Sequence, residues 1–366
     1  MKTPRIITKI RNFLSGTRRV TGMHITDEVI RFASFDVSRT RVTLYAYGEH
    51  FLSGDVIVHG KIVHPARLIH ALQTLRTAYD FEEVHIVLPE DHSHIFYTTF
   101  PYQEGMATSL EVAIKDHIDA YLEFHEKDFS GDFVCHGDII GMHNDTYELQ
   151  VTVTPRSLVS AYEHVFSSAG YQIASAEIGA HMLSRACVAS DAGESCVLVD
   201  FGKEKTHIAL VHEQRILEHE YIRLGEDAMI QEITDFLNTT EGEARKVHQR
   251  YGLLRTHREP ELLARLAQKI SPLRTIIDHM YIRWHTRDTK NKRQQDPITK
   301  IVLTGEGAHV KGFADHLAVV SRIPVEYAEV WRPFKKYAEY VPEIPYEESH
   351  RYAHVIAAIG KDVDTI

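Results

Sequence analysis

Two glycine-containing turns carry the residue types that handle phosphate, and the first follows an apolar stretch at 197–199. That stretch ends in Asp200, Gly202 and Lys203 form the turn, and Thr206 opens a second apolar stretch. Such a hairpin can aim backbone N–H groups at a phosphate, because glycine lets the chain approach closely. The Asp200 carboxylate could hold a magnesium-bound water. The same pattern is also common in plain turns, so both interpretations stay open.

The second turn lies about a hundred residues further on. An apolar segment at 301–303 predicts a buried strand, which leads into Thr304-Gly305-Glu306-Gly307 and then a predicted helix. Bare glycine backbone in front of a helix is a surface on which a nucleotide's flat groups can pack. Alone, this turn is as ambiguous as the first.

Other chemistry has weaker support. His92 and His94 would lie on one side of a strand, but no third ligand is indicated, so a surface strand is favoured over a zinc site. No Gly-x-Ser-x-Gly or Cys/His pattern suggests a covalent nucleophile. We therefore predict no catalytic residue. The three cysteines show no CxxC spacing and suit a reducing compartment.

The elements that must position the two turns occur twice along the chain. In each half, short β-rich segments predict a three-strand meander, followed by helical segments and a buried strand. In the first half these elements are expected at 20–25, 29–36, 42–50, 64–79 and 84–88. In the second half they are expected at 196–200, 206–212, 215–223, 228–237, 241–250, 259–287 with a bend at Pro272, 301–303 and a last helix at 347–359. An internal duplication predicts two similar lobes facing each other.

Two segments stand outside this repeat. The first, between 90 and 151, has a strand–helix–strand–strand pattern that predicts a small α+β subdomain. The second, residues 1–19, carries six basic and no acidic side chains, with apolar residues at helical spacing. It predicts a short basic amphipathic helix that could contact anionic lipid; a tail, or a helix docked on the body, is the alternative.

Taken in order, the two turns resemble the second phosphate loop and the adenosine loop of the actin, FtsA and Hsp70 superfamily. Further segments resemble motifs of PilM proteins of type IV pilus machines. These segments are Gly54–Ile62, Val84–Pro89 followed by Phe96–Pro101, Arg223–Asp227, Glu243–Gly252 and Trp331–Phe334. The resemblance implies an α/β actin-like fold of two lobes, duplicated ribonuclease-H-like domains around a nucleotide cleft, with the small α+β subdomain inserted in the first lobe.

The resemblance also implies domain boundaries. They are 1–19 for the basic segment, 20–89 and 152–195 for the first lobe core, 90–151 for the insert, 196–225 and 298–344 for the second lobe core, 226–297 for its helical upper subdomain, and 345–366 for a C-terminal helix returning to the first lobe.

Carried over residue by residue, the resemblance implies a nucleotide-binding set. Its members are Thr26, Asp200, Gly202, Lys203, Thr206, Arg245, His248, Gly305, Glu306 and Gly307, with Asp200 also holding magnesium through water. Several positions depart from the family pattern. His24 replaces an aspartate, Thr26 and Glu306 each replace a glycine, and Arg245 and His248 replace a Glu–Lys pair.

These departures weaken the predicted site. His24 removes an anionic metal ligand, Thr26 places a Cβ beside the phosphate, and Glu306 would add repulsion if it faces the phosphates. We therefore expect ATP or ADP with magnesium to bind weakly or not at all. Changed nucleotide specificity, with Arg245 contacting phosphate or adenine, is the alternative.

The charge and hydropathy of the chain limit its partners. A net charge of −10 gives no support for nucleic-acid binding. No apolar run approaches the roughly 20 residues that span a bilayer, and no signal-peptide core is seen. The resemblance implies a cytoplasmic component on the inner face of the cytoplasmic membrane, in a type IV pilus or related secretion platform. It would bind the N-terminal cytoplasmic peptide of a PilN-like membrane protein near residues 90–154.

Two other functions and a homo-oligomer remain open at this stage. An active ATPase or small-molecule kinase of this fold would need a general-base aspartate, for which no motif is seen. An FtsA-like filament protein usually ends in a basic amphipathic helix, whereas this sequence ends soon after its last predicted core helix, with Lys361-Asp362-Val363-Asp364.

Overall fold

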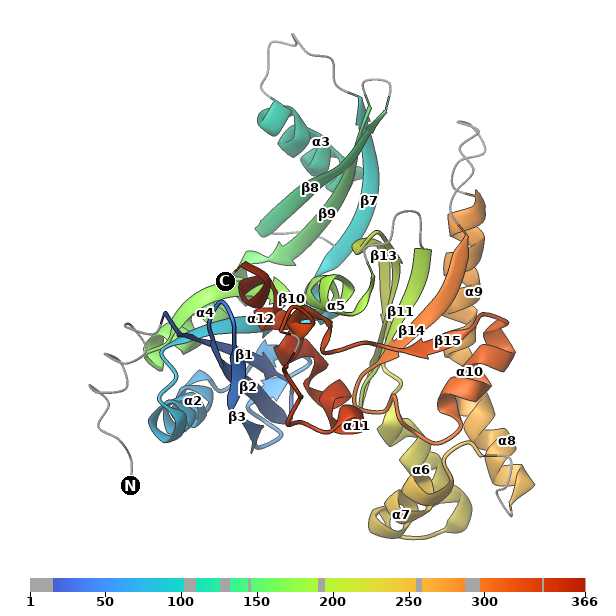
Figure 1. Ribbon diagram of the computed structural model, residues 1–366. Helices are drawn as coiled ribbons and strands as arrows, with labels where there is room; N and C mark the ends of the chain where they lie inside the picture. The colour runs from blue at the N-terminus through green and yellow to red at the C-terminus, as the bar shows by residue number, and fades with distance from the viewer. Residues whose placement is uncertain are drawn as a thin grey trace.

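The computed structural model describes residues 16–101, 110–125, 132–143, 146–189, 195–254, 259–286, 297–337 and 339–365. Two five-stranded sheets form the centres of two lobes (Figure 1). The first lobe's sheet has the order β10-β6-β1-β2-β3, with β1 at Arg18–Ile25, β2 at Val29–Val37, β3 at Val42–Phe51, β6 at Glu83–Leu88 and β10 at Gln172–Ile178. The second has the order β13-β12-β11-β14-β15, with β11 at Ser195–Phe201, β12 at Thr206–His212, β13 at Arg215–Ile222, β14 at Ile298–Thr304 and β15 at Val325–Tyr327.

The two sheets share one topology. In each, an antiparallel three-strand meander comes first, and two later strands are added in parallel beside the meander's first strand. Strand β11 is buried along its whole length, as expected for an apolar strand covered on both faces. The predicted duplication is confirmed by this strand order.

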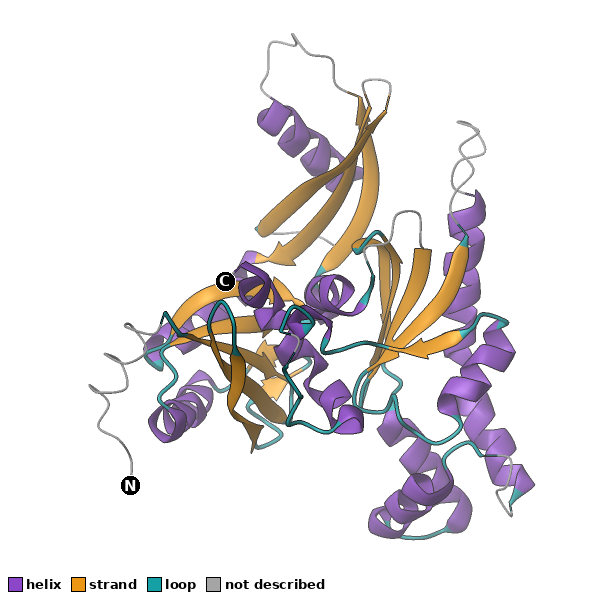
Figure 2. Ribbon diagram, viewed as in Figure 1, coloured by secondary structure: helices purple, strands orange, loops and turns teal. Residues whose placement is uncertain are grey.

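Helices cover the sheets and separate them (Figure 2). Helices α5 (Gly179–Cys187) and α12 (Ala353–Thr365) pack against each other; α12 contacts β1 and β6, and α5 contacts β12 and β13. A Cβ on Gly22 of β1 would collide with the carbonyl oxygen of Val355, so glycine permits this close approach of α12. Helices α2 (Pro65–Tyr79) and α4 (Arg156–Ser168) pack together beside the first sheet.

A small α+β unit projects from the lobes (Figure 1). Its three-stranded sheet has the order β7-β9-β8, with β7 at His94–Pro101, β8 at Phe133–His143 and β9 at Thr146–Pro155, and helix α3 covers Leu110–His125. This unit has an apolar core of its own, formed by Phe96, Ile118, Leu149, Val151 and Val153. The small subdomain expected in the first lobe is therefore present as a separately packed body.

The second lobe carries most of the remaining helices. They are α6 (Glu226–Leu237), α7 (Glu241–Tyr251), α8 (Pro260–Lys269), α9 (Ser271–Thr286) and α10 (Phe313–Ser321). The short elements are β4 (Ile57–Val58), β5 (Lys61–Ile62), the 3₁₀ turns η1 (Glu90–His92), η2 (Arg332–Phe334) and η3 (His350–Tyr352), and α11 (Tyr346–Ser349). None of the helices in the described ranges is long and apolar enough to cross a bilayer.

Three expectations about the elements need correction. The predicted bent helix at 259–287 is two helices, because Pro272 lacks an N–H donor and is accommodated in the first turn of α9. The predicted last helix at 347–359 is divided among α11, η3 and α12. Of the basic segment expected at 1–19, residues 1–15 lie outside the described residues, while Arg18 and Arg19 are the first residues of β1 and so belong to the first lobe's sheet.

Candidate functional site

A cavity of about 110 Å³ lies between the lobes. Six of the predicted nucleotide-binding residues line it: Thr26, Asp200, Gly202, Lys203, Gly305 and Glu306. Four others are not part of its lining: Thr206, Arg245, His248 and Gly307. Ligand pockets usually measure about 300–1,000 Å³, so this cavity is small for such a pocket.

The turn after β1 uses its own donors. The Thr26 hydroxyl accepts hydrogen bonds from the backbone N–H groups of Glu28, at 3.4 Å, and Val29, at 3.2 Å. The N–H of Thr26 donates to the Val29 carbonyl at 2.9 Å. Three backbone N–H donors of this turn are thereby occupied. A phosphate in the cleft could accept from them only if these internal hydrogen bonds were broken. Thr26 therefore differs from the family's glycine in two ways: it adds a Cβ, and its hydroxyl binds N–H groups of its own turn.

The turn between β11 and β12 places the ammonium group of Lys203 in the cleft. The N–H of Gly202 donates to the Lys205 carbonyl at 3.0 Å, and a Cβ on Gly202 would lie 2.7 Å from that oxygen, so this tight turn requires glycine. The Lys203 ammonium forms an ion pair with Glu28 of the other lobe and lies 3.8 Å from Asp227. Burial by itself would lower the Lys203 pKa, but the hydrogen bond to Glu28 and the nearby carboxylates raise it.

Glu306 is held by arginines of the first lobe and the C-terminal region. Arg31 of β2 donates to Glu306 at 2.6 Å and to Glu49 of β3 at 2.7 Å. Arg351 lies 3.5 Å from the same Glu306 carboxylate. Glu306 therefore joins the adenosine-loop position to the first lobe through ion pairs. Glu306 neutralises Arg31 and Arg351, and Glu28 neutralises Lys203. These cations would otherwise be free to bind a phosphate.

Asp200 faces imidazoles. Its Oδ2 is 3.4 Å from His354 Nε2, and the His354 ring stacks on His24 with 4.3 Å between ring centroids. Burial, and then the electrostatic interaction with His354, hold the pKa of His24 well below its usual value. Gly305 has a φ of 101°, and its missing Cβ leaves room for the Asp200 carboxylate. Magnesium prefers oxygen ligands, so one carboxylate beside the His354 imidazole fits that ion poorly.

The four predicted residues outside the cavity make structural contacts. The Thr206 hydroxyl donates to the Leu224 carbonyl at 2.5 Å, and the Gly307 N–H donates to the Phe201 carbonyl at 2.9 Å. Arg245 pairs with Asp227, at 3.0 Å, and Glu241, at 2.7 Å. His248 is buried, with Nδ1 3.2 Å from Glu226. The side chains of Arg245 and His248 are thus engaged within α6 and α7.

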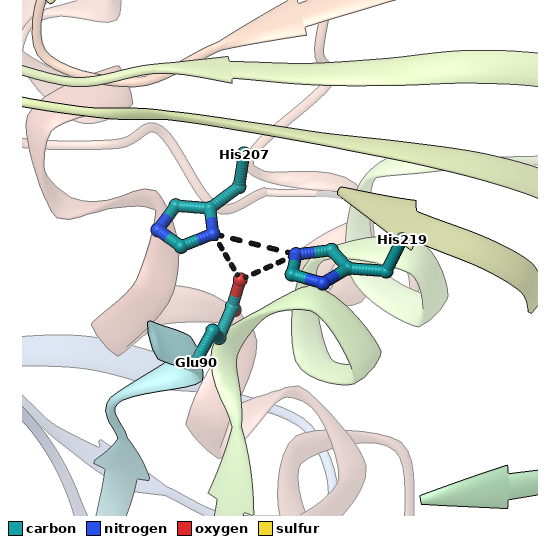
Figure 3. Close-up of side chains that lie close together, drawn as sticks. All are labelled: Glu90, His207 and His219. Carbon is teal, nitrogen blue, oxygen red and sulfur yellow. Dashed lines mark hydrogen bonds and ion pairs between the residues drawn. The ribbon is translucent and has the colours of Figure 1, made fainter. Parts of the chain in front are cut away.

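Several residues that line the cavity were missed by the sequence analysis. They are Glu28, Arg31, Glu90, His207, His350, Arg351 and His354. Glu90 also contacts His207 and His219, and the three side chains converge on one point (Figure 3). The only signal in the sequence was its 25 histidines, which does not tell which of them meet.

Two lobes of matching topology with a cleft between them define an actin-like fold. The chain belongs to the type IV pilus assembly protein PilM family, whose family model matches residues 22–357. No curated protein matches the sequence. The solved structures include a PilM–PilN type IV pilus biogenesis complex, with 15% identity and a TM-score of 0.70 over 94% of this chain and 97% of that chain.

Two further solved structures support the fold alone. MreB5 of Spiroplasma citri bound to ADP has 11% identity and a TM-score of 0.56 over 95% of this chain and 98% of its own. The ethanolamine utilization protein EutJ from Carboxydothermus hydrogenoformans has 12% identity and a TM-score of 0.52 over 93% and 89%. The expected fold class and family are therefore confirmed.

Proposed function

We propose that this chain is a cytoplasmic assembly component of a type IV pilus or related secretion platform, held at the inner face of the cytoplasmic membrane by a PilN-like protein. The observation that carries the proposal is its similarity, over nearly the whole chain, to a protein solved in a PilM–PilN complex. The bound element would be the partner's short N-terminal cytoplasmic peptide, and the binding region would lie near residues 90–154.

The open edge of the small sheet supports the assignment of residues 90–154 as the binding region. Within the described residues, β8 pairs with β9 alone, and the opposite edge strand, β7, lies beside β13. Strand β8 is 11 residues long and exposes Val134, Ile139 and Met142 by 36%, 46% and 63%. A long edge strand with exposed apolar side chains is a template for an added strand. An extended peptide could bind there by backbone hydrogen bonds, with its side chains over the apolar positions.

The test is a titration of a labelled N-terminal peptide from a PilN-like protein of the same genome, followed by fluorescence anisotropy. The double variant Ile139→Lys/Met142→Lys should weaken binding at least about tenfold, or about 1.4 kcal/mol. Phe51→Lys is the matched control, because Phe51 is an apolar residue 73% exposed on β3. Deleting residues 90–151 should abolish binding. A well-folded deletion that still binds the peptide would exclude this region as the binding site.

We also propose that the nucleotide site is weakened or lost and that the chain has no ATPase or kinase activity. Support comes from the Thr26 hydroxyl bonded to its own turn, from Glu28 paired with Lys203, and from Glu306 paired with Arg31. Calorimetry with ATP or ADP and magnesium should detect no micromolar binding. Micromolar ATP binding that disappears in Asp200→Ala would contradict this and favour the active-ATPase alternative.

A further inference from the structure

Glu90, His207 and His219 bring three metal-ligating atoms together where the lobes meet (Figure 3). Glu90 Oε2 lies 2.9 Å from His207 Nδ1 and 3.1 Å from His219 Nε2, and the two nitrogens are 3.3 Å apart. In a tetrahedral zinc site with bonds of about 2.0–2.1 Å, neighbouring ligand atoms lie about 3.3 Å apart. The triangle formed by these atoms is therefore close to one face of such a tetrahedron.

The strand register brings the two histidines together. His207 of β12 pairs with Tyr221 of β13, and Ala209 pairs with His219. Since alternate residues of a strand share a face, His207 and His219 are diagonal neighbours on one face of the sheet. Their rings stack with 5.4 Å between centroids. Glu90 comes from the other lobe, at the start of η1, directly after the end of the first-lobe strand β6 and Pro89.

Glu90 is buried, and its carboxylate lacks some of its hydrogen-bond partners. Glu90 is 5% exposed, and its second oxygen, Oε1, is buried without a hydrogen-bond partner among the described residues. A buried carboxylate oxygen of this kind is unfavourable unless a ligand or ion completes it. If both nitrogens carry a proton, two N–H groups point at one oxygen from nitrogens only 3.3 Å apart, which crowds their hydrogens. The convergence of both nitrogens on Glu90 Oε2 is the feature that indicates a cation between these three atoms, whereas Oε1 lies on the side of Gly179.

We propose that Glu90, His207 and His219 form a site for a divalent transition metal, with zinc as the ion that this ligand set suits best. Two neutral imidazoles and a carboxylate are typical zinc ligands, and three protein ligands leave a fourth position for water or another ligand. Glu90 and His207 also line the interlobe cavity, so the proposed site borders it. The nearby Lys205 ammonium is paired with Asp91, which offsets its repulsion of a cation.

A metal bound here would link the lobes. Glu90 belongs to the first lobe, and both histidines belong to the second lobe's sheet. A bound ion would hold β12 and β13 against the end of β6 beside the nucleotide cleft. It would thus stabilise the closed arrangement of the lobes independently of nucleotide, since binding to the folded state alone raises stability.

The test uses the full chain, stripped of metal with a chelator and titrated with ZnCl₂ by calorimetry and with CoCl₂ by absorbance. We expect one tight equivalent per chain, the visible bands of tetrahedral cobalt, and a higher melting temperature with zinc. Glu90→Gln and His219→Asn should each weaken binding at least about tenfold, because even the outer partners of metal ligands contribute about 10–100-fold. Absence of a stoichiometric site, or equal affinity in both variants, would overturn the proposal.

Two further variants distinguish this site from casual surface binding and from a folding defect. His64→Asn is the matched control for surface binding, because His64 lies 3.6 Å from Asp55 on the exposed surface; its affinity should equal that of the unaltered chain. His219→Cys keeps a ligand at the same position and should add a thiolate–cobalt charge-transfer band. If His219→Asn fails to fold, the cysteine variant still decides: a folded protein that takes up cobalt without that band excludes His219 as a ligand.

Discussion

Replacing Arg31 with leucine should reveal how strongly ion pairs hold the cleft closed. The Arg31 guanidinium bonds to Glu49 at 2.7 Å and to Glu306 at 2.6 Å, and so links β2 to the turn after β14. The Arg31 side chain is 10% exposed, and those of Glu49 and Glu306 are 17% and 16% exposed. Leucine keeps much of the apolar stem and removes the charge.

The expected loss of stability follows from this burial. Removing one partner of a buried ion pair usually costs about 3–5 kcal/mol, because a buried charge is left uncompensated. Here the carboxylates keep some contact with water, and Arg351 remains 4.0 Å from Glu49 and 3.5 Å from Glu306. We therefore expect Arg31→Leu to lower the free energy of unfolding by about 2–3 kcal/mol. Glu306→Gln should cost only about 1 kcal/mol, because Arg31 keeps Glu49.

The assay is chemical denaturation at pH 7, followed by circular dichroism. A double-mutant cycle of Arg31→Leu with Glu306→Gln should give a coupling of about 1–2 kcal/mol. Arg274→Ala is the control, because it breaks a surface pair with Asp278 whose side chains are 53% and 43% exposed. Such a pair contributes about 0.5 kcal/mol at most. If Arg31→Leu changes stability no more than this control does, the ion pairs do not hold the cleft and the reasoning is refuted.

Three other predictions follow from separate features. Burial and the neighbouring His309 lower the His350 pKa from 6.5 to about 4. The unfolded chain therefore takes up this proton first, and stability should fall as the pH drops from 6.5 toward 4, by about 1.4 kcal/mol per pH unit. His350→Leu should flatten the pH dependence of the melting temperature in that window, and an unchanged slope would show that His350 does not cause it. Gly305→Ala should cost about 2 kcal/mol or more in chemical denaturation, because a side chain at a φ of 101° is strained and would meet Asp200. Gly54→Ala, with nothing within 4 Å of its Cβ, should change stability by less than about 0.5 kcal/mol. Finally, deleting residues 1–15 should abolish retention on anionic liposomes, and salt should weaken retention of the intact chain; equal retention on neutral liposomes would contradict recognition of anionic lipid by this basic segment.

Much of the fold could be predicted from local patterns. The β-rich segments at 20–50 and 196–223 are strands, because alternation and apolar runs are local properties of a chain. Their repetition predicted two lobes of the same topology. Element ends were less accurate: β14 extends from Ile298 to Thr304, beyond the predicted 301–303, because pairing with β11 continues through less apolar residues. The prediction of one long helix at 259–287 was wrong, because the pattern did not show that a new helix would begin beside Pro272.

The candidate site was predicted in part, for the same physical reason. Turns that follow strand ends, such as the one containing Gly202, are local, so their places in the cleft could be expected from sequence and family resemblance. The hydrogen-bond and ion-pair partners of each side chain could not be predicted from the sequence. Thr206 was predicted as a ligand contact, yet its hydroxyl is taken by the Leu224 carbonyl. Glu306 was expected to repel phosphate if it faced the phosphates, and the sequence did not show that it would pair with Arg31.

The sequence by itself determined the order of strands and helices, the duplication and the positions of the glycine turns, because each depends on neighbouring residues. Only the tertiary structure decided which charged groups meet. Glu28 reaches Lys203, and Glu90 reaches His207 and His219, because the approach of the lobes and the register of β12 on β13 bring distant segments within bonding distance. The contacts of Glu90 are buried, whereas the Lys203 and Glu28 side chains stay 29% and 42% exposed, and the energy of each charge depends on these surroundings in space.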